Sequence, residues 1–583
     1  MGINETGVSR RSFITGAAAA GVLATLGLAG CTPQDKQTAS AGPSGSHTKW
    51  DEECDVLVVG SGYTGLAAAL EAKNAGADVK VIEKTARVGG NSALAAGDFA
   101  VCNSSVQKRE GVQDSVEQYV DDMMVAGLHL NDKEKCRVIA EKSNETWEWT
   151  IEMGATWAKN DNDEYFLYPY GGHTVMRSIA QGDGGGANVT GPFAEKLKGL
   201  GVEVETKRML TELVKDANGR VIGAIVHDKP SGNDVESGTP VAIKANKAVV
   251  LTTGGFGRDL AFRQAQDPRL DDSVDCTNQE GATAESLRAS VAAGAMAVHT
   301  DWIQLLPFMS PDEQGYGVAA FYTDGQASYA PTLDVATGKR IVNELTDRKR
   351  YADAILKTGQ PCVQITCKKA LYDGGSGLEG ALKAGITTEF SSIEEAAEHY
   401  GMPVDAVKEE IARYNTFVAN KLDEDFKKPI PDDAQTIDEP PFYGVRLWPK
   451  VHHCMGGVKT DLECRVVDMD LQVIPGLYAA GEAVGGIHGA CRLGSCATAD
   501  CLVNGRIAGQ NAAKEASSAG RLASARCGVP TPARTPHRLS PESRGFAAKS
   551  EAFMRQRAPY QPTRAAPPPG RATSEPPTKQ RLE

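Results

Sequence analysis

Apolar runs, a glycine turn and a helix-forming stretch follow one another at residues 55–82. The apolar run 55–59 is typical of a buried parallel strand. A glycine-rich turn occupies 60–65, and residues 66–72, which are rich in Ala and Leu, favour a helix. A second apolar run at 78–82 predicts the next strand. This order of strand, turn, helix and strand predicts an α/β fold with a parallel sheet.

The turn has the glycine spacing that is typical of dinucleotide-binding proteins. Gly60, Gly62 and Gly65 carry the Gly-x-Gly-x-x-Gly pattern, and Thr64 lies within it. Glycines at these positions let backbone N–H groups approach a pyrophosphate at the start of a helix. Glu83 ends the second predicted strand, where a carboxylate accepts hydrogen bonds from an adenosine ribose. The glycine pattern is weak alone, but the complete order of elements indicates a dinucleotide site.

Two more stretches extend the predicted sheet. Residues 202–226 are typical of paired strands around a turn at 216–219. Residues 248–257 predict a strand that ends in another glycine turn, which contains Gly254 and Gly255.

The longest apolar run of the chain follows an arginine pair near the N-terminus. The pair at 10–11 precedes an Ala- and Gly-rich run at 13–30, and Cys31 comes directly after the run. The pair resembles a twin-arginine (Tat) export signal, and Leu-Ala-Gly-Cys resembles a lipobox whose cysteine is lipidated. We therefore expect a signal at 1–31, a flexible tether at 32–49, and an exported protein anchored by lipid at the outer face of the cytoplasmic membrane or in the periplasm. The alternative is a transmembrane anchor, because eighteen apolar residues reach the lower limit of a spanning helix.

Composition separates the C-terminal end from the rest of the chain. The 583 residues, enough for two or more domains, carry a formal net charge of −13, which argues against a nucleic-acid partner. Residues 521–583 hold ten Arg and two Lys against four Glu, a net charge of +8, so residues 1–520 carry −21. Eleven of the 29 prolines also lie in this tail. We expect a disordered basic tail without a role in activity. It is either a lipid-binding extension or, as we favour, the product of a shifted reading frame.

The thirteen cysteines have no spacing that is typical of a metal site or a haem attachment. Cysteines of exported proteins often form disulfides, but this chain contains neither Cys-x-x-Cys nor Cys-x-x-Cys-His. We therefore expect buried thiols and no metal.

Three motifs in the second half of the chain identify a family. They are Asn-Glu-Leu-Thr-Asp-Arg at 343–348, His-His-Cys-Met-Gly-Gly at 452–457 and His-Gly-Ala-Cys-Arg-Leu-Gly at 488–494. With these motifs the chain resembles the fumarate reductase flavoproteins, including fumarate and urocanate reductases, over about residues 50–515. The resemblance implies FAD as the cofactor and a Rossmann-like FAD-binding domain in two sequence segments, with an inserted α+β capping domain. The implied bounds are 50–303 for the first FAD segment, 304–449 for the capping (substrate) domain and 450–520 for the second FAD segment.

The resemblance implies a role for one residue of each motif. In the family, the arginine of the first motif delivers a proton, and the His of the second and the Arg of the third hold the substrate carboxylate. By position these roles fall to Arg348, His452 and Arg492. A guanidinium gives up its proton reluctantly, so Arg348 needs a carboxylate relay, for which Asp324 is the nearest candidate. The alternatives are a structural ion pair for the arginines, a packed side chain for His452 and a surface turn at Asp324.

The resemblance also implies contacts between further residues and FAD. These flavoproteins have a second glycine turn near the isoalloxazine ring, just beyond the acidic residue that is Glu83 here. The segment 476–483 resembles the strand and turn that return to the flavin. The implied contacts are Gly89, Gly90, Asn91, Ser92, Gly254, Gly255, Glu482, Gly494 and Ser495.

The sequence departs from fumarate reductases at one substrate position. Those enzymes carry Ile-Gln-x-His-Pro, whose His binds the second carboxylate, whereas residues 303–307 have Leu306 in its place. Leucine cannot donate a hydrogen bond to an anion, and residues 310–317 look more like the urocanate reductase branch. We therefore expect reduction of the activated C=C bond of a urocanate- or aryl-acrylate-like acid, with a hydride from N5 of FAD and a proton from Arg348.

Two other functions share the predicted fold. A flavin dehydrogenase of the 3-ketosteroid type would not require the two arginines. A non-catalytic, lipid-anchored flavoprotein would only relay electrons. Because the sequence shows no haem pattern and no complete FMN-attachment segment, we expect an external cytochrome or flavoprotein to supply electrons in anaerobic respiration.

Overall fold

The computed structural model describes residues 49–168, 172–182, 184–372 and 375–517 of the chain. The predicted signal with Cys31, nearly all of the predicted tether and the predicted basic tail lie outside these ranges, so the structure does not test those predictions. Within the described ranges, no helix is both long and apolar enough to cross a membrane.

The largest sheet has eight strands and a parallel centre. The strands are β1 (Glu52–Val59), β2 (Val79–Glu83), β6 (Val204–Thr206), β7 (Arg208–Lys215), β8 (Val221–Asp228), β9 (Thr239–Leu251), β18 (Arg465–Val467) and β19 (Val473–Ala479). Their order is β18-β19-β9-β1-β2-β6, and β8 and β7 extend from β9. Strands β19, β9, β1, β2 and β6 run parallel. The predicted α/β fold with a parallel sheet is therefore confirmed.

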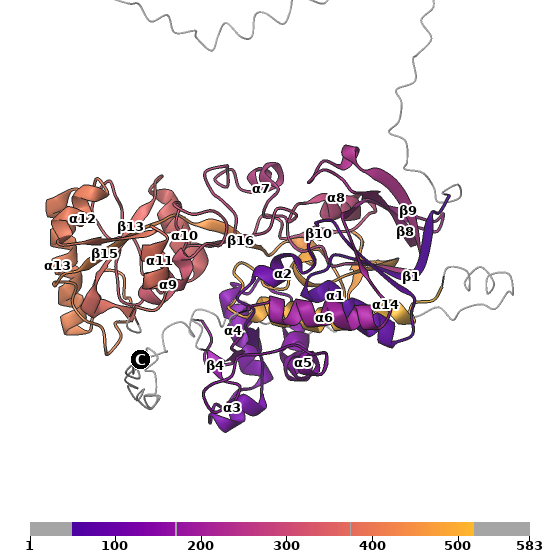
Figure 1. Ribbon diagram of the computed structural model, residues 1–583, viewed down its shortest axis with the longest axis horizontal. Helices are drawn as coiled ribbons and strands as arrows, with labels where there is room; N and C mark the ends of the chain where they lie inside the picture. The colour runs from indigo at the N-terminus through magenta and orange to yellow at the C-terminus, as the bar shows by residue number, and fades with distance from the viewer. Residues whose placement is uncertain (1–48, 169–171, 183, 373–374, 518–583) are drawn as a thin grey trace, which may run out of the picture. The chain divides into compact units, whose positions relative to one another are not determined.

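Helices α1 (Tyr63–Asn74) and α14 (Cys496–Lys514) pack against each other and against the sheet (Figure 1). A Cβ atom on Gly505 would lie 2.6 Å from the carbonyl oxygen of Thr64, and one on Gly509 would lie 2.2 Å from that of Ala68. Glycine at both positions lets the two backbones approach closely. Because α1 and α14 come from opposite ends of the described chain, two distant segments form one domain.

Residues 202–226 match the predicted paired strands only in part. Strands β7 and β8 pair antiparallel around the turn at 216–219, as predicted. Strand β6, however, pairs in parallel with β2 and extends the central sheet. The prediction was wrong there because a short apolar run does not show which partner it pairs with.

The residues between the two FAD-binding segments form a second sheet with its own apolar core. Strands β12 (Thr332–Leu333), β13 (Cys362–Cys367), β15 (Phe442–Leu447) and β14 (Thr387–Phe390) pair antiparallel in this order. The helices of this region are α9 (Ala319–Gln326), α10 (Arg348–Lys357), α11 (Leu378–Lys383), α12 (Ile393–His399) and α13 (Val404–Asn420) (Figure 1). Its largest core cluster includes Val363, Ile365, Tyr414 and Phe417.

The chain enters and leaves this second region through one pair of strands. Strand β11 (Ile303–Leu306) pairs antiparallel with β16 (Lys450–Cys454). The predicted boundary at 303/304 falls within β11, and the one at 449/450 falls directly before β16. Residues of the inserted region therefore begin and end beside each other, next to the FAD-binding segments.

The remaining elements surround the large sheet. They are β3 (Phe99–Ala100), β4 (Leu167–Tyr168), β5 (Ser178–Ile179), β10 (Ala297–Val298), β17 (Gly457–Val458), α2 (Gly90–Leu94), α3 (Ser105–Arg109), α4 (Val116–Ala126), α5 (Lys133–Glu152), α6 (Ala187–Gly199), α7 (Leu260–Gln266) and α8 (Glu285–Ala292). The cysteines of the described ranges are buried, except Cys501, which is half-buried.

Candidate active site

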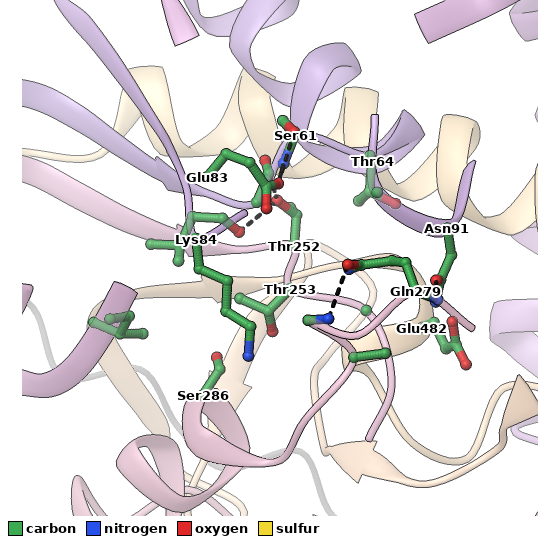
Figure 2. A pocket seen from close by; sticks show the side chains of 18 of the residues that line it. Ser61, Thr64, Glu83, Lys84, Asn91, Thr252, Thr253, Gln279, Ser286 and Glu482 are labelled. Carbon is green, nitrogen blue, oxygen red and sulfur yellow. Dashed lines mark hydrogen bonds between the residues drawn. The ribbon is translucent and has the colours of Figure 1, made fainter. Parts of the chain in front are cut away.

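A cavity with about 840 Å³ of empty space, which includes space open to solvent, lies where β1, β2 and β9 end (Figure 2). Its lining includes Gly60 after β1, Glu83 at the end of β2 and Gly254 after β9. The carboxyl ends of parallel strands are the usual ligand-binding edge of such a sheet. The cavity therefore lies where a dinucleotide is expected.

The carboxylate of Glu83 joins the two glycine turns. Its Oε2 accepts hydrogen bonds from the backbone N–H of Ser61 (3.1 Å) and from the Ser61 hydroxyl (2.7 Å) (Figure 2). The same hydroxyl oxygen accepts from the N–H of Gly89 (3.0 Å), and Oε1 of Glu83 accepts from the N–H of Thr85 (2.9 Å). A carboxylate has about four acceptor positions, so Glu83 keeps capacity for a ribose hydroxyl on the cavity side.

The first glycine turn has no room for side chains. Gly60 has a φ of +106°, and a Cβ atom there would lie 2.4 Å from the carbonyl oxygen of Thr252. A Cβ atom on Gly65 would lie 1.9 Å from the carbonyl oxygen of Gly60. The N-cap of α1, Gly62, supplies no side-chain hydrogen bond, so N–H groups at the helix start remain for an anionic ligand. Thr64 also lines the cavity.

The second glycine turn lies beside the first. Gly89 and Gly90 both have positive φ values, +108° and +52°. The hydroxyl of Ser92 accepts a hydrogen bond from the N–H of Tyr63 (3.0 Å), and Oδ1 of Asn91 accepts from the N–H of Gln279 (2.8 Å). Gly90, Asn91 and Ser92 line the cavity, whereas Gly89 reaches it only through the Ser61 hydroxyl.

Glu482 lines the cavity from the second sequence segment (Figure 2). Its Oε1 accepts a hydrogen bond from the N–H of Cys454 (2.9 Å). A Cβ atom on Gly255 would lie 2.5 Å from the same oxygen, so this position also needs a glycine. Burial raises the pKa of Glu482 to about 7. Gly254 belongs to the lining, and Gly255 lies behind Glu482.

Gly494 and Ser495 lie outside the lining of this cavity, directly before α14. The carbonyl oxygen of Gly494 contacts Nε2 of His173 at 2.9 Å, and the hydroxyl of Ser495 lies 2.5 Å from that of Ser178. The structure therefore places these two residues next to Arg492 and not beside Glu83.

The predicted substrate residues come from four separate elements. Arg348 is the first residue of α10, Asp324 lies in α9, His452 lies in β16, and Arg492 lies in the segment before α14. Their charges act on one another: burial and then the positive charges of Arg492 and Arg348 lower the pKa of His452 well below its usual value. Burial and the charge of Arg348 likewise lower the pKa of Arg492 to about 10.

Neither arginine forms an ion pair with a carboxylate of the described residues. Arg492 is buried, and its Nε has no hydrogen-bond partner there. In the described chain the guanidinium donates only to the adjacent carbonyl oxygen of Leu493 (3.2 Å), whereas the backbone N–H donates to Oε1 of the distant Gln304 (2.9 Å). A structural ion pair, the alternative for both residues, is therefore wrong within the described chain.

Asp324 lies inside a helix and is exposed, so the alternative of a surface turn is wrong about the turn and correct about the surface. Desolvation by the surrounding protein raises the pKa of its carboxyl group, and the charge of Arg348 opposes that rise. His452 is half-buried, and its Nδ1 lies 2.8 Å from the hydroxyl of Thr277.

Tyr316 belongs to this group of residues, although the sequence did not single it out. Its ring lies 6.3 Å from the ring of His452 and 5.8 Å from that of Phe321. Gly315 and Gly317 flank it with φ values of +62° and +60°. The one available signal was the Gly-Tyr-Gly sequence. We call Arg348, Asp324, His452, Arg492 and Tyr316 the substrate cluster.

The loop that carries Tyr316 is held at both ends. The N–H of Gly315 donates to Oδ2 of Asp275 (2.8 Å), and its carbonyl oxygen accepts from Nζ of Lys450 (3.0 Å). The carboxylate of Glu313 accepts from the backbone N–H of Val318 (2.6 Å) and Ala319 (2.9 Å). Backbone anchors therefore fix the loop, and ring contacts with Phe321 and His452 orient the tyrosine side chain.

Comparisons with known proteins agree with this architecture. The chain matches the model of an FAD-binding domain family over residues 55–498. It is 37% identical to the acrylate reductase flavoprotein subunit of Shewanella woodyi over 87% of this chain and 98% of that protein. It is 32% identical to the urocanate reductase of Eggerthella lenta over 79% of this chain and 75% of that protein. A solved flavocytochrome c3 fumarate reductase in an open conformation superimposes with a TM-score of 0.68 and 32% identity, covering 80% of this chain and 79% of that one.

The fold, the glycine turns and Glu83 define an FAD-dependent oxidoreductase. Its cofactor is FAD, because the chain matches the FAD-binding family and the cavity offers N–H groups for the pyrophosphate, a carboxylate for the ribose and a first turn in which Gly60 and Gly65 leave no space for side chains. The chain belongs to the fumarate reductase flavoprotein family.

Proposed function

We propose that this protein reduces the activated C=C bond of an unsaturated monocarboxylic acid. The observation that carries the proposal is the pair of arginines, Arg348 and Arg492, whose charges act on each other and which form no ion pair with a carboxylate of the described chain. A buried cation without a counter-charge is costly. A substrate carboxylate supplies the missing charge, and the planar guanidinium of Arg492 matches it with two hydrogen bonds.

His452 assists Arg492 as a neutral donor. Burial and the neighbouring arginines keep its pKa well below the usual value, so the ring is uncharged at neutral pH. Nδ1 lies 2.8 Å from the hydroxyl of Thr277, which also lies 3.3 Å from the carbonyl oxygen of Val451. In the proposed arrangement the hydroxyl donates to Nδ1 and not to that carbonyl oxygen. The proton of the ring is then on Nε2, which donates to the substrate carboxylate and polarises the conjugated double bond.

Reduction adds a hydride to one carbon and a proton to the other. FAD, when bound, supplies the hydride. Arg348 delivers the proton to the second carbon, and Asp324 returns a proton to the guanidinium. The raised pKa of Asp324 suits this role, because its carboxyl group holds a proton at higher pH than an ordinary aspartate.

A single carboxylate on the substrate is inferred from Leu306. This side chain is 3% exposed and packs with Phe308, Met309 and Tyr351. A second carboxylate would meet apolar atoms there, and leaving a charge unpaired against them is unfavourable. The rings of Tyr316 and Phe321 add aromatic surface near the cluster. Acrylates with an apolar or aromatic substituent, such as cinnamate and urocanate, meet these conditions, and fumarate does not.

Export and electron supply are part of the same proposal. Cys31, in the lipobox-like sequence, would anchor the protein at the outer face of the cytoplasmic membrane or in the periplasm. A separate cytochrome or flavoprotein would then reduce the FAD in anaerobic respiration.

A panel of acceptors tests the proposed reaction. The purified holoprotein is reduced chemically without oxygen. The return of the oxidised flavin absorption is followed after addition of acrylate, cinnamate, urocanate, fumarate, a quinone or an unsaturated 3-ketosteroid. We expect at least one monocarboxylate to reoxidise the flavin about tenfold faster than fumarate. Faster reaction with fumarate would overturn the substrate assignment. Reoxidation by quinones alone would favour an electron-transfer flavoprotein, and reaction with a 3-ketosteroid alone would favour the steroid dehydrogenase alternative.

A further inference from the structure

Arg177 is completely buried and lies outside the substrate cluster. Its Nε and Nη2 donate to the two carboxylate oxygens of Asp114 (3.0 and 2.9 Å), and its Nη1 donates to Oδ2 of Asp122 (2.5 Å). A cation held between two carboxylates in the interior is fixed in direction as well as in charge. The direction in which Arg177 can contact a further side chain is therefore also fixed.

That further side chain is His173. Its Nδ1 lies 2.8 Å from Nη1 of Arg177. A guanidinium can only donate, so Nδ1 accepts and carries no proton. The ring proton is then on Nε2, which lies 2.9 Å from the carbonyl oxygen of Gly494 and donates to it. Burial and the charge of Arg177 lower the pKa of His173 to about 4, so this neutral form persists at neutral pH.

Gly494 belongs to a short segment, residues 492–495, that joins Arg492 to α14. The same stretch of chain that carries His173 and Arg177 holds this segment a second time, because the hydroxyl of Ser178 lies 2.5 Å from that of Ser495. Ser495 has a positive φ of +57°, which a non-glycine residue adopts only when its surroundings impose it. Residues 173–178 therefore help to hold the backbone of 492–495. Gln304 holds the N–H of Arg492, and the hydroxyl of Ser495 donates to the carbonyl oxygen of Gly494 (2.6 Å).

Arg492 depends on that backbone path. Within the described chain, its guanidinium donates only to the carbonyl oxygen of the adjacent Leu493, and its Nε has no partner. No distant side chain of the described residues orients the guanidinium. A shift of the segment would therefore move it directly.

We propose that His173 is a positioning residue of the active site, which holds Gly494 so that Arg492 faces the substrate carboxylate. Arg177, between Asp114 and Asp122, keeps His173 in the tautomer that makes this contact. The inference rests on the proposed role of Arg492 in carboxylate binding. His173, Arg177, Asp114 and Asp122 do not belong to the lining of the cavity.

Two substitutions of His173 test the roles of its two ring nitrogens separately. In His173→Asn the side-chain amide replaces Nδ1, so the acceptor for Arg177 remains and the donor to Gly494 is lost. In His173→Gln the amide replaces Nε2, so the donor to Gly494 remains. The measurements are the KM and kcat of the holoenzyme with acrylate and cinnamate, and the affinity for the saturated acids propionate and 3-phenylpropionate, detected through the flavin absorption.

We expect His173→Asn to raise KM and to weaken binding of the saturated acid about tenfold, with a smaller change in kcat. His173→Gln should stay within about threefold of the unaltered protein for both quantities. Equal results for the two variants, whether both are unchanged or both impaired, would overturn the inference. If His173→Asn yields no holoenzyme, Ser178→Ala takes its place, and a KM equal to that of the unaltered protein would then overturn it.

The activity of the unaltered protein distinguishes a failure of this inference from a failure of the proposed function. If it reduces none of the unsaturated acids, the proposed function fails whatever the variants do. If it reduces them and the variants behave alike, only the role of His173 fails.

Discussion

The ring of Tyr316 lies 6.3 Å from the ring of His452, which brings a loop of the inserted region next to β16. The loop is fixed through Gly315 and Glu313, and the phenol forms no hydrogen bond within the described chain. A positioned hydroxyl without a partner, next to Arg348 and His452, is suited to contact a substrate.

Removing this hydroxyl should weaken substrate binding. We expect Tyr316→Phe to raise KM for the preferred acid roughly tenfold and to change kcat little, because a hydrogen bond to a charged group contributes about 1.5–3 kcal/mol. Steady-state kinetics measures both values. Tyr329→Phe is the matched control, since its hydroxyl pairs with Asp433 at an exposed position. An unchanged KM in Tyr316→Phe would refute the contact.

Replacing Arg348 should impair the chemical step. We expect Arg348→Ala to lower kcat by about a hundredfold or more, the usual contribution of a general acid. Arg350 lies on the same helix with an exposed side chain, and among the described residues its side chain pairs only with Asp347. Arg350→Ala should therefore retain the activity of the unaltered protein. Similar losses in the two variants would mean that the effect comes from the helix and not from proton delivery.

The pH dependence of the reaction should change when Asp324 is replaced. Its pKa is raised, so the carboxyl group stays protonated further toward neutral pH and loses its proton as the pH rises through that value. If the protonated carboxyl group of Asp324 supplies the proton to Arg348, kcat falls as the pH rises through this pKa. We expect Asp324→Asn to have a lower kcat and to lack this decrease at high pH. The same decrease in Asp324→Asn would assign it to another group.

The first glycine turn gives a direct test of the FAD site. A Cβ atom on Gly65 would lie 1.9 Å from the carbonyl oxygen of Gly60, so Gly65→Ala must displace the turn. We expect this variant to be purified without FAD. Gly191→Ala is the control, because a Cβ atom there meets nothing within 4 Å and Gly191 lies within α6. It should retain FAD and gain up to about 1 kcal/mol of stability. The flavin absorption per protein measures both outcomes.

The sequence predicted those parts of the site that depend on local order. The strand, turn and helix around Gly60 and Gly65 are encoded by neighbouring residues, and Glu83 follows from the end of the next strand. The motifs with Arg348, His452 and Arg492 are recognisable because each is a short contiguous pattern. Their proximity in space followed only from the family resemblance.

The contacts that the sequence did not reveal join residues far apart in the chain. His173 and Gly494 are 321 positions apart, and no spacing rule relates them. Tyr316 lies in a loop whose path is set by Asp275 and Lys450, residues from other elements. Such contacts depend on how complete elements pack, which periodicity along the chain does not encode.

Glu482 should make the stability of the flavin-free protein depend on pH. Burial raises its pKa from 4.5 to about 7, so the folded state favours the protonated carboxyl group. The stability that this group contributes is fully present below about pH 4.5 and is lost as the pH rises through about 7. A shift of this size corresponds to about 3 kcal/mol. Glu482→Gln keeps an oxygen that accepts from the N–H of Cys454 and removes the titration.

Urea unfolding of the flavin-free protein and of Glu482→Gln, over a series of pH values, measures this contribution as a difference. Groups common to both proteins cancel in that difference. We expect the unaltered protein to lose about 3 kcal/mol relative to the variant between pH 4.5 and pH 8, because only its buried carboxyl group must ionise. A difference that stays constant with pH would mean that Glu482 ionises as readily in the folded as in the unfolded chain, and burial would then not control its charge.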